Sequence, residues 1–430
     1  MSRTTWALWS GFALLGAGLA MLIYLNSNHF TTTDSTYYLQ SAANLLAGRG
    51  YVMRDAGQFV WNATFPMGYP VLIAALSKLT GLSVLWASKW VNYGAVGVSA
   101  YLWIRRLGGG RANPPHRRGC GLPTGRAVWP LSVWALGGFL RIGAHTWSEA
   151  LFLVLLAEWV WWLHQFLLTP TNRRTATLLA LGYGLFLTRY VGGYVFGLTG
   201  LISVTMLARP VWIHNALAVP VARPSAVRLL WVTTAGVVLM GAYFGLNYAL
   251  SGTATGGERL GLTEDAGTLL TLFGRAVINE LLVVRDFVPD VPNGLAWFGL
   301  AFQAIWLTVL YRRIRQTPSL VQPLATFDAS LALRRLFVLT GLGYVAVLFA
   351  LRTISPFDAP DVRLMAPATY CGLWAGLLWV TTLPVAGQRV FRPYWLALLL
   401  VSWLQLLPQA DMSRKLRQVL VDFKHRGHGD

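Results

Sequence analysis

Long apolar runs separated by short basic breaks occupy most of this chain. A hydrocarbon core ~30 Å thick requires about 20 apolar residues in each helix that crosses it. This length predicts membrane-spanning helices over residues 6–25, 84–104, 127–144, 148–168, 176–208, 229–250, 293–311, 335–351, 363–383 and 393–408. The segment 176–208 is long enough for a hairpin of two short helices that turns near Arg189. The pattern therefore predicts an all-α, polytopic membrane protein with about 11 transmembrane helices.

The composition changes this picture only by excluding other classes. Of the 430 residues, 55% are hydrophobic and 12% are charged, and the mean hydropathy is +0.51. A soluble domain with a wetted surface does not sustain such values. The net charge of +19 comes from basic residues that stand mostly between the apolar runs. They indicate topology signals and contacts with anionic lipid or phosphate, and we expect no nucleic-acid partner.

The basic breaks also predict which loops are cytoplasmic. Six arginines lie between residues 105 and 126, and further arginines lie within 173–174, 209–228 and 312–335. Lys and Arg concentrate in cytoplasmic loops. The short apolar run 69–79 therefore cannot span, because every later basic loop would then be external.

This constraint predicts a first external loop over residues 26–83 with two interfacial helices, about 35–47 and 67–80. Residues 1–408 would form one transmembrane domain, followed by a basic tail over residues 409–430. Eleven helices place this basic tail outside. Either the tail is an external amphipathic segment, or the count is wrong by one helix.

Charged residues gather on the predicted external side. Asp34 opens the first loop at an expected helix N-cap, and Glu149 begins the helix over 148–168. Three arginines lie near the same boundary, namely Arg189, Arg259 and Arg363. A carboxylate within reach of an acceptor hydroxyl or amine serves as general base. A guanidinium binds the oxygens of a departing phosphate. These side chains predict transfer from a phosphate leaving group that a lipid tail holds in the bilayer.

A series of short motifs follows in a recognisable order. They are Asp34 with Tyr37 and Tyr38, then LLAGRGY, FPMGYP, Ser148 with Glu149, Thr188 to Tyr190, Asn247 to Gly256, and Asp361 to Pro367. In this order the chain resembles the GT-C superfamily of polytopic glycosyltransferases, which use polyprenyl-phosphate sugars. The likeness is to the protein O-mannosyltransferase and lipid A aminoarabinose transferase group. One departure is Leu364, which stands where the family usually has Tyr.

The resemblance implies a GT-C-like fold with juxtamembrane helices in the first external loop, and it assigns roles to individual residues. Asp34 is implied as catalytic base and Glu149 as an assisting acid, while Arg189 and Arg363 would bind the donor phosphate. We expect further donor contacts from Arg259, Tyr37, Tyr38 and Tyr69.

No second acid adjoins Asp34, so neither a metal nor another cofactor is expected. The implied protein lies in the cell's inner or plasma membrane with an extracytoplasmic site. Its partners would be membrane lipids and a polyprenyl-phosphate sugar. The sugar would pass with inversion to a lipid, glycan or protein acceptor.

Each assignment has a structural alternative. Asp34 would then only cap its helix, and Arg189 and Arg363 would be structural ion-pair partners. Glu149 and Glu158 lie nine positions apart on nearly opposite faces, so at most one faces a given site.

A buried acid of this helix would instead pair with an arginine such as Arg141, and His145 would be an ordinary hydrogen-bonding residue rather than a proton shuttle. At the level of the whole protein, the alternative is a flippase or transporter of a lipid-linked saccharide. Such a protein usually carries charged groups near the bilayer midplane, whereas the charges here are expected at the outer boundary.

Overall fold

The computed structural model describes residues 3–26, 28–108, 132–217, 223–256, 265–285, 294–321, 328–354 and 360–406. The α-helices are α1 Arg3–Leu25, α2 Thr33–Leu46, α3 Gly68–Thr80, α4 Val84–Gly108, α6 Gly137–Ala144, α7 Glu149–Leu168, α8 Asn172–Thr188, α9 Tyr194–Ala208, α10 Pro210–Leu217, α11 Arg223–Ser251, α12 Ala266–Glu280, α13 Gly294–Gln316, α14 Asp328–Ile354, α15 Val362–Thr382 and α16 Val385–Ser402. Short 3-10 helices are η2 Ser132–Ala135, η3 Tyr190–Gly193, η4 Pro318–Val321 and η5 Trp403–Leu406. The strands are β1 Val52–Asp55 and β2 Gln58–Trp61.

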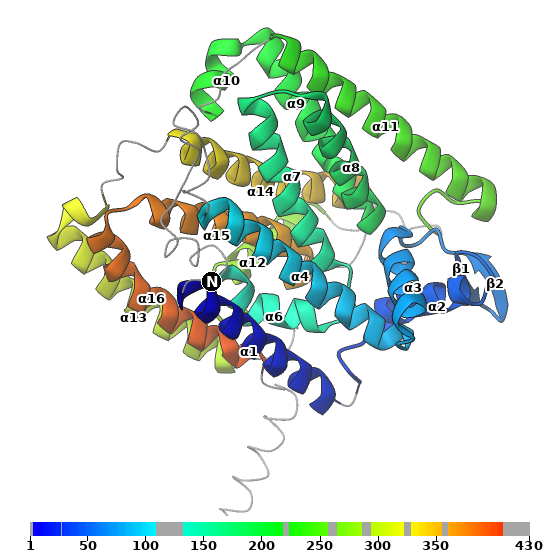
Figure 1. Ribbon diagram of the computed structural model, residues 1–430, viewed down its shortest axis with the longest axis horizontal. Helices are drawn as coiled ribbons and strands as arrows, with labels where there is room; N and C mark the ends of the chain where they lie inside the picture. Colours follow the sequence, from blue (N-terminus) through cyan, green and yellow to red (C-terminus); the bar gives the residue numbers. More distant parts are fainter. Residues whose placement is uncertain are drawn as a thin grey trace, which may run out of the picture.

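Helix α7 lies at the centre of the bundle (Figure 1). It packs against α8, α4, α14 and α15, which leaves few of its side chains exposed. Helix α7 itself carries apolar residues on every face, and a helix of this kind is typically buried in a protein interior. The charged residue at its start, Glu149, is therefore buried, although it lies at one end of the helix.

The predicted number of membrane-spanning helices finds only partial support in the described residues. In the part of the chain that the structure describes, six helices are long and apolar enough to cross a bilayer: Glu149–Leu168, Tyr190–Ala208, Arg223–Ser251, Leu295–Gln316, Leu331–Ile354 and Val362–Thr382. The pair α3 and α4, bent by 107°, would add a seventh. The protein is a multi-pass membrane protein of helical fold, but the predicted count of 11 is not confirmed.

The predicted span over 127–144 is wrong in its described part. Residues 132–144 form only η2 and the eight-residue helix α6. This segment packs against the end of α16, where the Trp403 indole donates to Ala135 O and Gly137 N–H donates to the Ser402 hydroxyl. A Cβ at Gly137 would meet the backbone of Ser402 at 2.0 Å, so the contact requires glycine. Tertiary packing thus interrupts an apolar run that was long enough to span.

Other observed elements agree with those predicted from the sequence. The hairpin within 176–208 is confirmed as α8 and α9, with Arg189 at the turn. The two helices predicted in the first loop are confirmed as α2 and α3, and their interfacial position stays a prediction. The hairpin of β1 and β2 was not predicted, and neither were α10 and α12. The basic tail over 409–430 lies outside the described residues, so its side of the membrane stays a prediction.

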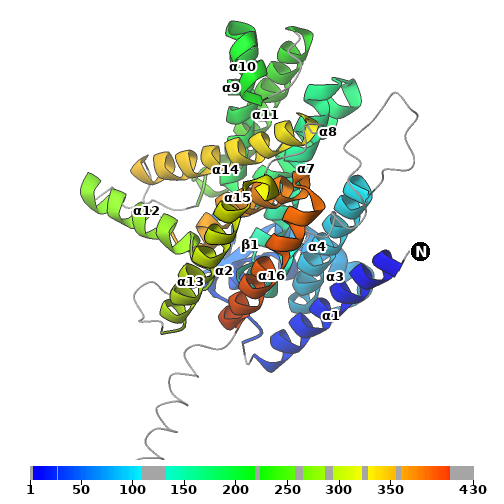
Figure 2. The ribbon, with the colours of Figure 1, turned by 90° about the vertical axis from the view of Figure 1, so that its left-hand side faces the viewer.

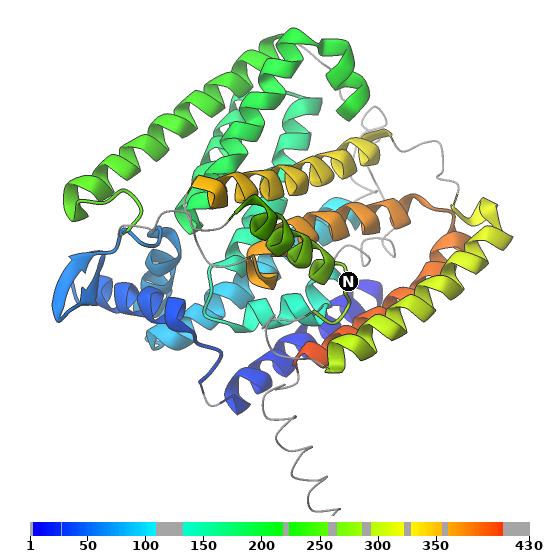
Figure 3. The same ribbon diagram turned by 180° about the vertical axis from the view of Figure 1, so that it is seen from behind.

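The first loop forms a separate group of elements at one end of the bundle (Figures 1 and 3). Tyr38 and Ala42 of α2 pack against Tyr69 and Ile73 of α3 and against Leu151 of α7. These residues recur at helical spacing, which gives each short helix one apolar face. In the perpendicular view, α1 and α4 lie beside this group (Figure 2). The start of α2 is thereby held next to the start of α7.

Candidate active site

The N-terminus of α2 places Asp34 differently from the prediction. The N-cap residue is Thr32, whose N–H donates to the Ser35 hydroxyl at 3.0 Å in a capping box. Asp34 lies in the first turn instead, so its predicted N-cap position is wrong. Because Thr32 and Ser35 already cap the helix, capping alone does not explain an acid at position 34.

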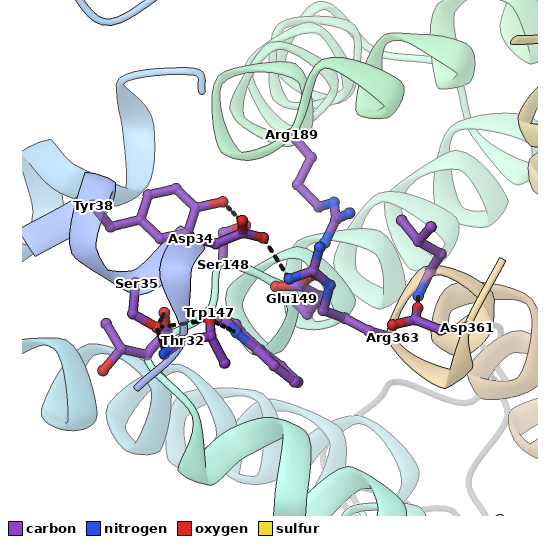
Figure 4. Close-up of polar contacts among 12 residues, drawn as sticks. Thr32, Asp34, Ser35, Tyr38, Trp147, Ser148, Glu149, Arg189, Asp361 and Arg363 are labelled. Carbon is purple, nitrogen blue, oxygen red and sulfur yellow. Dashed lines mark hydrogen bonds and ion pairs between the residues drawn. The ribbon is translucent and has the colours of Figure 1, made fainter. Parts of the chain in front are cut away.

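Four charged side chains from four separate segments meet at this end of the bundle (Figure 4). Arg363 Nη1 lies 2.5 Å from Asp34 Oδ2, and Arg363 Nε lies 3.1 Å from Glu149 Oε1. Arg189 Nη1 pairs with the same Glu149 oxygen. The sequence predicted that these residues share one side of the membrane, and their direct contact confirms that they converge.

The two carboxylates differ in their access to solvent. The side chain of Asp34 is 28% exposed, whereas that of Glu149 is only 4% exposed. Asp34 is held by one arginine, and Glu149 is held by two. Asp34 is therefore the acid that an incoming group can reach, and Glu149 is the buried anchor of both guanidinium groups.

Arg363 is held on a further side by Trp147. Its guanidinium carbon lies 5.2 Å from the centre of the Trp147 ring, within the range of a cation–π contact. The Trp147 indole donates to the Thr32 hydroxyl at 2.9 Å, which orients the ring. Nearby, Asp361 accepts from Leu364 N–H at 2.8 Å and caps α15. Burial raises the pKa of the Asp361 carboxyl, and this hydrogen bond and Arg363 oppose the rise.

The three predicted donor-binding tyrosines take different positions. The Tyr38 hydroxyl lies 3.2 Å from the Ser148 hydroxyl, beside Glu149, and burial raises the pKa of this phenol above its ordinary value. Tyr37 is half-buried against Phe65. Tyr69 is fully buried, donates to Ser88 O at 3.4 Å and makes an edge-to-face contact with Tyr38. Arg259, the remaining predicted contact, lies outside the described residues.

The turn that carries Arg189 is tied to the first loop through Asn247. The Asn247 amide donates to the Tyr190 hydroxyl at 2.9 Å and accepts from the Trp61 indole at 2.9 Å. Tyr190 in turn donates to Ala63 O at 2.8 Å. This network links the end of α11, the turn before α9 and the strand β2. It fixes the residue next to Arg189 against the loop that carries Asp34.

Glu158, the other acid of α7, belongs to a different pair. Both of its oxygens accept from Arg106, at 2.7 and 2.6 Å, and the partner is therefore Arg106 rather than the suggested Arg141. At 1.5 Å per residue, Glu158 lies about 13 Å further along α7 than Glu149. This pair lies within the bundle, so charged groups are not limited to the cluster at the start of α7.

His145 does not have the environment of a proton shuttle. Its ring stacks on Trp147 with centroids 3.7 Å apart, and Nδ1 lies 2.8 Å from Arg141 O. Burial lowers the pKa of His145 to about 3, with smaller contributions from neighbouring cations. The imidazole therefore stays neutral near pH 7.

The described residues include no cluster of side chains suited to bind a metal ion. Within the described ranges, His, Cys, Asp and Glu side chains form no group of three or more that could hold an ion. The sequence-based expectation of metal-independent chemistry stays a prediction.

Two contributors to the site, Thr32 and Trp147, were missed from the sequence, because they are visible only through their contacts. Lys89, an ionisable residue within a predicted span, was also missed, and it donates to the carbonyls of Phe30 and Ala144 near the site.

Fold and site together define a multi-pass helical membrane protein with an arginine and carboxylate cluster at one end of its bundle. Neither a protein-family model nor a curated protein matches the sequence. Among solved structures, the chain is similar to ArnT from Cupriavidus metallidurans bound to undecaprenyl phosphate. That match has 14% identity, covers 89% of this chain and 78% of that chain, and has a TM-score of 0.41. The apo state of the same protein matches with 15% identity, coverage of 87% and 78%, and a TM-score of 0.39.

Proposed function

We propose that this protein is an inverting membrane glycosyltransferase that moves a sugar from a polyprenyl phosphate to an acceptor on the extracytoplasmic side of the cell membrane. The observation that carries the proposal is the four-residue cluster, in which a partly open carboxylate, Asp34, shares Arg363 with the buried Glu149. An acid accessible to an acceptor beside two guanidinium groups is the chemistry that transfer from a phosphate requires. The ordered motifs that resemble the GT-C superfamily support the same reading.

The reaction is a single displacement at the anomeric carbon. The acceptor oxygen or nitrogen forms a bond to that carbon while the bond from the carbon to the phosphate oxygen breaks. The bonding electrons leave with the polyprenyl phosphate, and the acceptor proton passes to Asp34. Because the acceptor attacks opposite the leaving group, the configuration inverts. The hydroxyl or amine could belong to a lipid, a glycan or a protein, and the sugar to a hexose or a pentose.

The arginines supply the positive charge that the departing phosphate needs. Arg189 and Arg363 both bind Glu149, which leaves the remaining guanidinium nitrogens of each for phosphate oxygens. Donors that are already in position stabilise developing charge by several kcal/mol, since they need no reorganisation as the bond breaks. In this proposal Glu149 assists by positioning both guanidinium groups, and it takes no proton itself.

Asp34 can accept a proton only when the donor phosphate has replaced it at Nη1 of Arg363. Nη1 of Arg363 is bound to Asp34 Oδ2. A donor phosphate competes for the same nitrogen and carries negative charge of its own. Its arrival would release Asp34 for the acceptor, and we therefore propose that the donor binds first.

One observation favours the second candidate, a flippase for a lipid-linked saccharide. The Arg106 and Glu158 pair lies within the helices, where transporters carry charged groups. Both oxygens of Glu158 are satisfied by Arg106, however, and this closed pair offers no obvious group to a substrate.

The test is transfer by the purified protein in lipid. A panel of polyprenyl-phosphate sugars, radiolabelled in the sugar, is incubated with candidate acceptors, and both acceptor labelling and polyprenyl phosphate release are measured. We expect release that depends on an acceptor and is absent with Asp34→Asn. Asp55→Asn, which alters an exposed acid in the same loop, serves as the matched control. Movement of labelled lipid between leaflets without bond cleavage would instead establish the flippase.

A further inference from the structure

Lys89 of α4 is a buried cation with an unusual set of partners. The residue is only 5% exposed, and its ammonium group donates to Ala144 O at 2.8 Å and to Phe30 O at 3.4 Å. Among the ion pairs of the described residues, none includes Lys89. Burying an ammonium group costs several kcal/mol, even when carbonyl oxygens replace part of its hydration. Because no ion pair among the described residues offsets this cost, Lys89 is a candidate for a functional role.

Ser88 and Asn92, two neighbours of Lys89 on α4, bind the residues that follow Ala144. At about 100° per residue, Ser88, Lys89 and Asn92 share one face of the helix. The Ser88 hydroxyl lies 2.9 Å from the Thr146 hydroxyl. The Asn92 amide donates to His145 O at 2.9 Å and to Trp147 O at 3.2 Å. This face of α4 therefore holds residues 144–147, which immediately precede Ser148 and Glu149.

The approach to α2 is bound to that same stretch. Thr146 N–H donates to Phe30 O at 3.1 Å, and the Ser35 hydroxyl donates to Thr146 O at 2.9 Å. Phe30 lies four residues before Asp34, and Ala144 lies five residues before Glu149. Lys89 binds both of these carbonyls, so its ammonium group stands where the two catalytic segments meet.

We propose that Lys89 is a positioning residue of the active site: by binding the carbonyls of Phe30 and Ala144 it fixes Asp34 relative to Glu149 and its two arginines. This inference rests on the proposed function. Lys89 contacts neither the donor nor the acceptor, and it acts only through the segments that it joins.

The expected kinetic effect of changing Lys89 follows from its indirect role. Glu149 still holds both arginines when Lys89 is changed, so donor binding is largely preserved. The loosened contact lies between the Asp34 segment and the rest of the site. A misplacement of about 1 Å can cost up to about 100-fold in rate. The loss therefore falls on kcat and not on the KM for the donor.

The experiment compares three variants in the transfer assay. Lys89→Met keeps the apolar stem and removes the ammonium group, Lys89→Arg restores a charged donor, and Lys78→Met removes an exposed lysine of α3 as the matched control. For Lys89→Met we expect kcat to fall about 10- to 100-fold, with the donor KM within about threefold of wild type. Lys89→Arg should recover most of kcat, and Lys78→Met should match the wild type.

A second measurement covers the case in which Lys89→Met folds poorly. Lys89→Gln supplies a side-chain amide N–H that can donate to one of the two carbonyls. We expect its loss of kcat to be larger than that of Lys89→Arg and smaller than that of Lys89→Met. Amide hydrogen exchange in residues 30–38 and 144–150 should be faster in Lys89→Gln than in wild type, because the segments are less firmly joined.

The outcomes separate the inference from the proposed function. Wild-type kcat in Lys89→Met, equal losses in the Met and Arg variants, or unchanged exchange in Lys89→Gln would overturn the positioning role alone. A wild-type protein that transfers no sugar from any polyprenyl phosphate would overturn the proposed function and the inference with it.

Discussion

Arg363 Nη1 donates to Asp34 Oδ2 at 2.5 Å, which joins a guanidinium at the start of α15 to a carboxylate 329 positions earlier in the chain. The same guanidinium lies 3.1 Å from Glu149 through its Nε. A single side chain thus links the proposed base to the buried anchor of the site. Each of these contacts can be broken separately, and the results should differ.

Replacing Asp34 with asparagine should abolish activity without unfolding the protein. We expect transfer to fall about 10²- to 10⁴-fold, because an amide cannot accept the acceptor proton. The free energy of unfolding should change by about 1 kcal/mol or less, since Asp34 is partly exposed and Arg363 keeps its contact with Glu149. Initial rates and thermal unfolding measure the two effects. Wild-type rates in this variant would exclude Asp34 as the base.

Replacing Glu149 with glutamine should affect both stability and donor binding. Two largely buried guanidinium groups lose their shared carboxylate, and breaking a buried ion pair on one side costs about 3–5 kcal/mol. The donor KM should rise, since neither arginine is held in place. Chemical unfolding in micelles and donor titration measure these changes.

The matched control for that variant is Glu158→Gln on the same helix. It breaks the pair with Arg106 and should lower stability to a similar extent while leaving the donor KM unchanged. A rise in donor KM of equal size in both variants would show that Glu149 acts only through folding.

Replacing Arg363 with lysine should impair donor binding although the charge is kept. A lysine presents one compact ammonium group, whereas the guanidinium reaches Asp34 and Glu149 from different nitrogens. We expect the donor KM to rise by about tenfold, equivalent to ~1.4 kcal/mol. Arg54→Lys, on an exposed position of β1, is the control. An unchanged donor KM in Arg363→Lys would remove Arg363 from the phosphate site.

The stability of the protein should depend on pH through His145. Its pKa is lowered from 6.5 to about 3 by burial, so below about pH 6.5 the unfolded chain takes up a proton that the folded protein does not. Stability is therefore lost as the pH falls from about 6.5 toward about 3, by up to about 1.4 kcal/mol per pH unit.

Unfolding measured at pH 7 and pH 5 tests this dependence. His145→Gln should remove this contribution to the slope, and His214→Gln, which changes an exposed imidazole, should retain it. Equal slopes in wild type and His145→Gln would show that His145 does not contribute.

Several elements were predictable because their signal is local. The amphipathic spacing of Tyr38 and Ala42 marked α2, and a leading proline and a closing Gly81 marked α3. The unpredicted hairpin of β1 and β2 had only a weak local signal, the glycine of its two-residue turn at Ala56 and Gly57. Both turn residues take positive φ angles, 46° and 86°, as such tight turns require.

Other features depend on contacts across the fold. The run over 127–144 satisfies the length of a span, yet its described part is broken where Gly137 meets Ser402. The capping of α2 by Thr32 involves Trp147, which is 115 positions away. No local pattern distinguishes an Asp that caps a helix from one that lies in its first turn beside a distant arginine.

The sequence by itself determined that the chain is a helical membrane protein and that its acids and arginines gather toward one side. Both properties can be read from local sequence, namely the length of each apolar run and the basic residues in the loops between the runs. Only the tertiary structure decided which charges pair, that Glu149 anchors two arginines while Asp34 stays accessible, and that Lys89 joins their segments. Those choices depend on distances between side chains that folding alone establishes, because the strength of an ion pair depends on separation and burial in space and not on spacing along the chain.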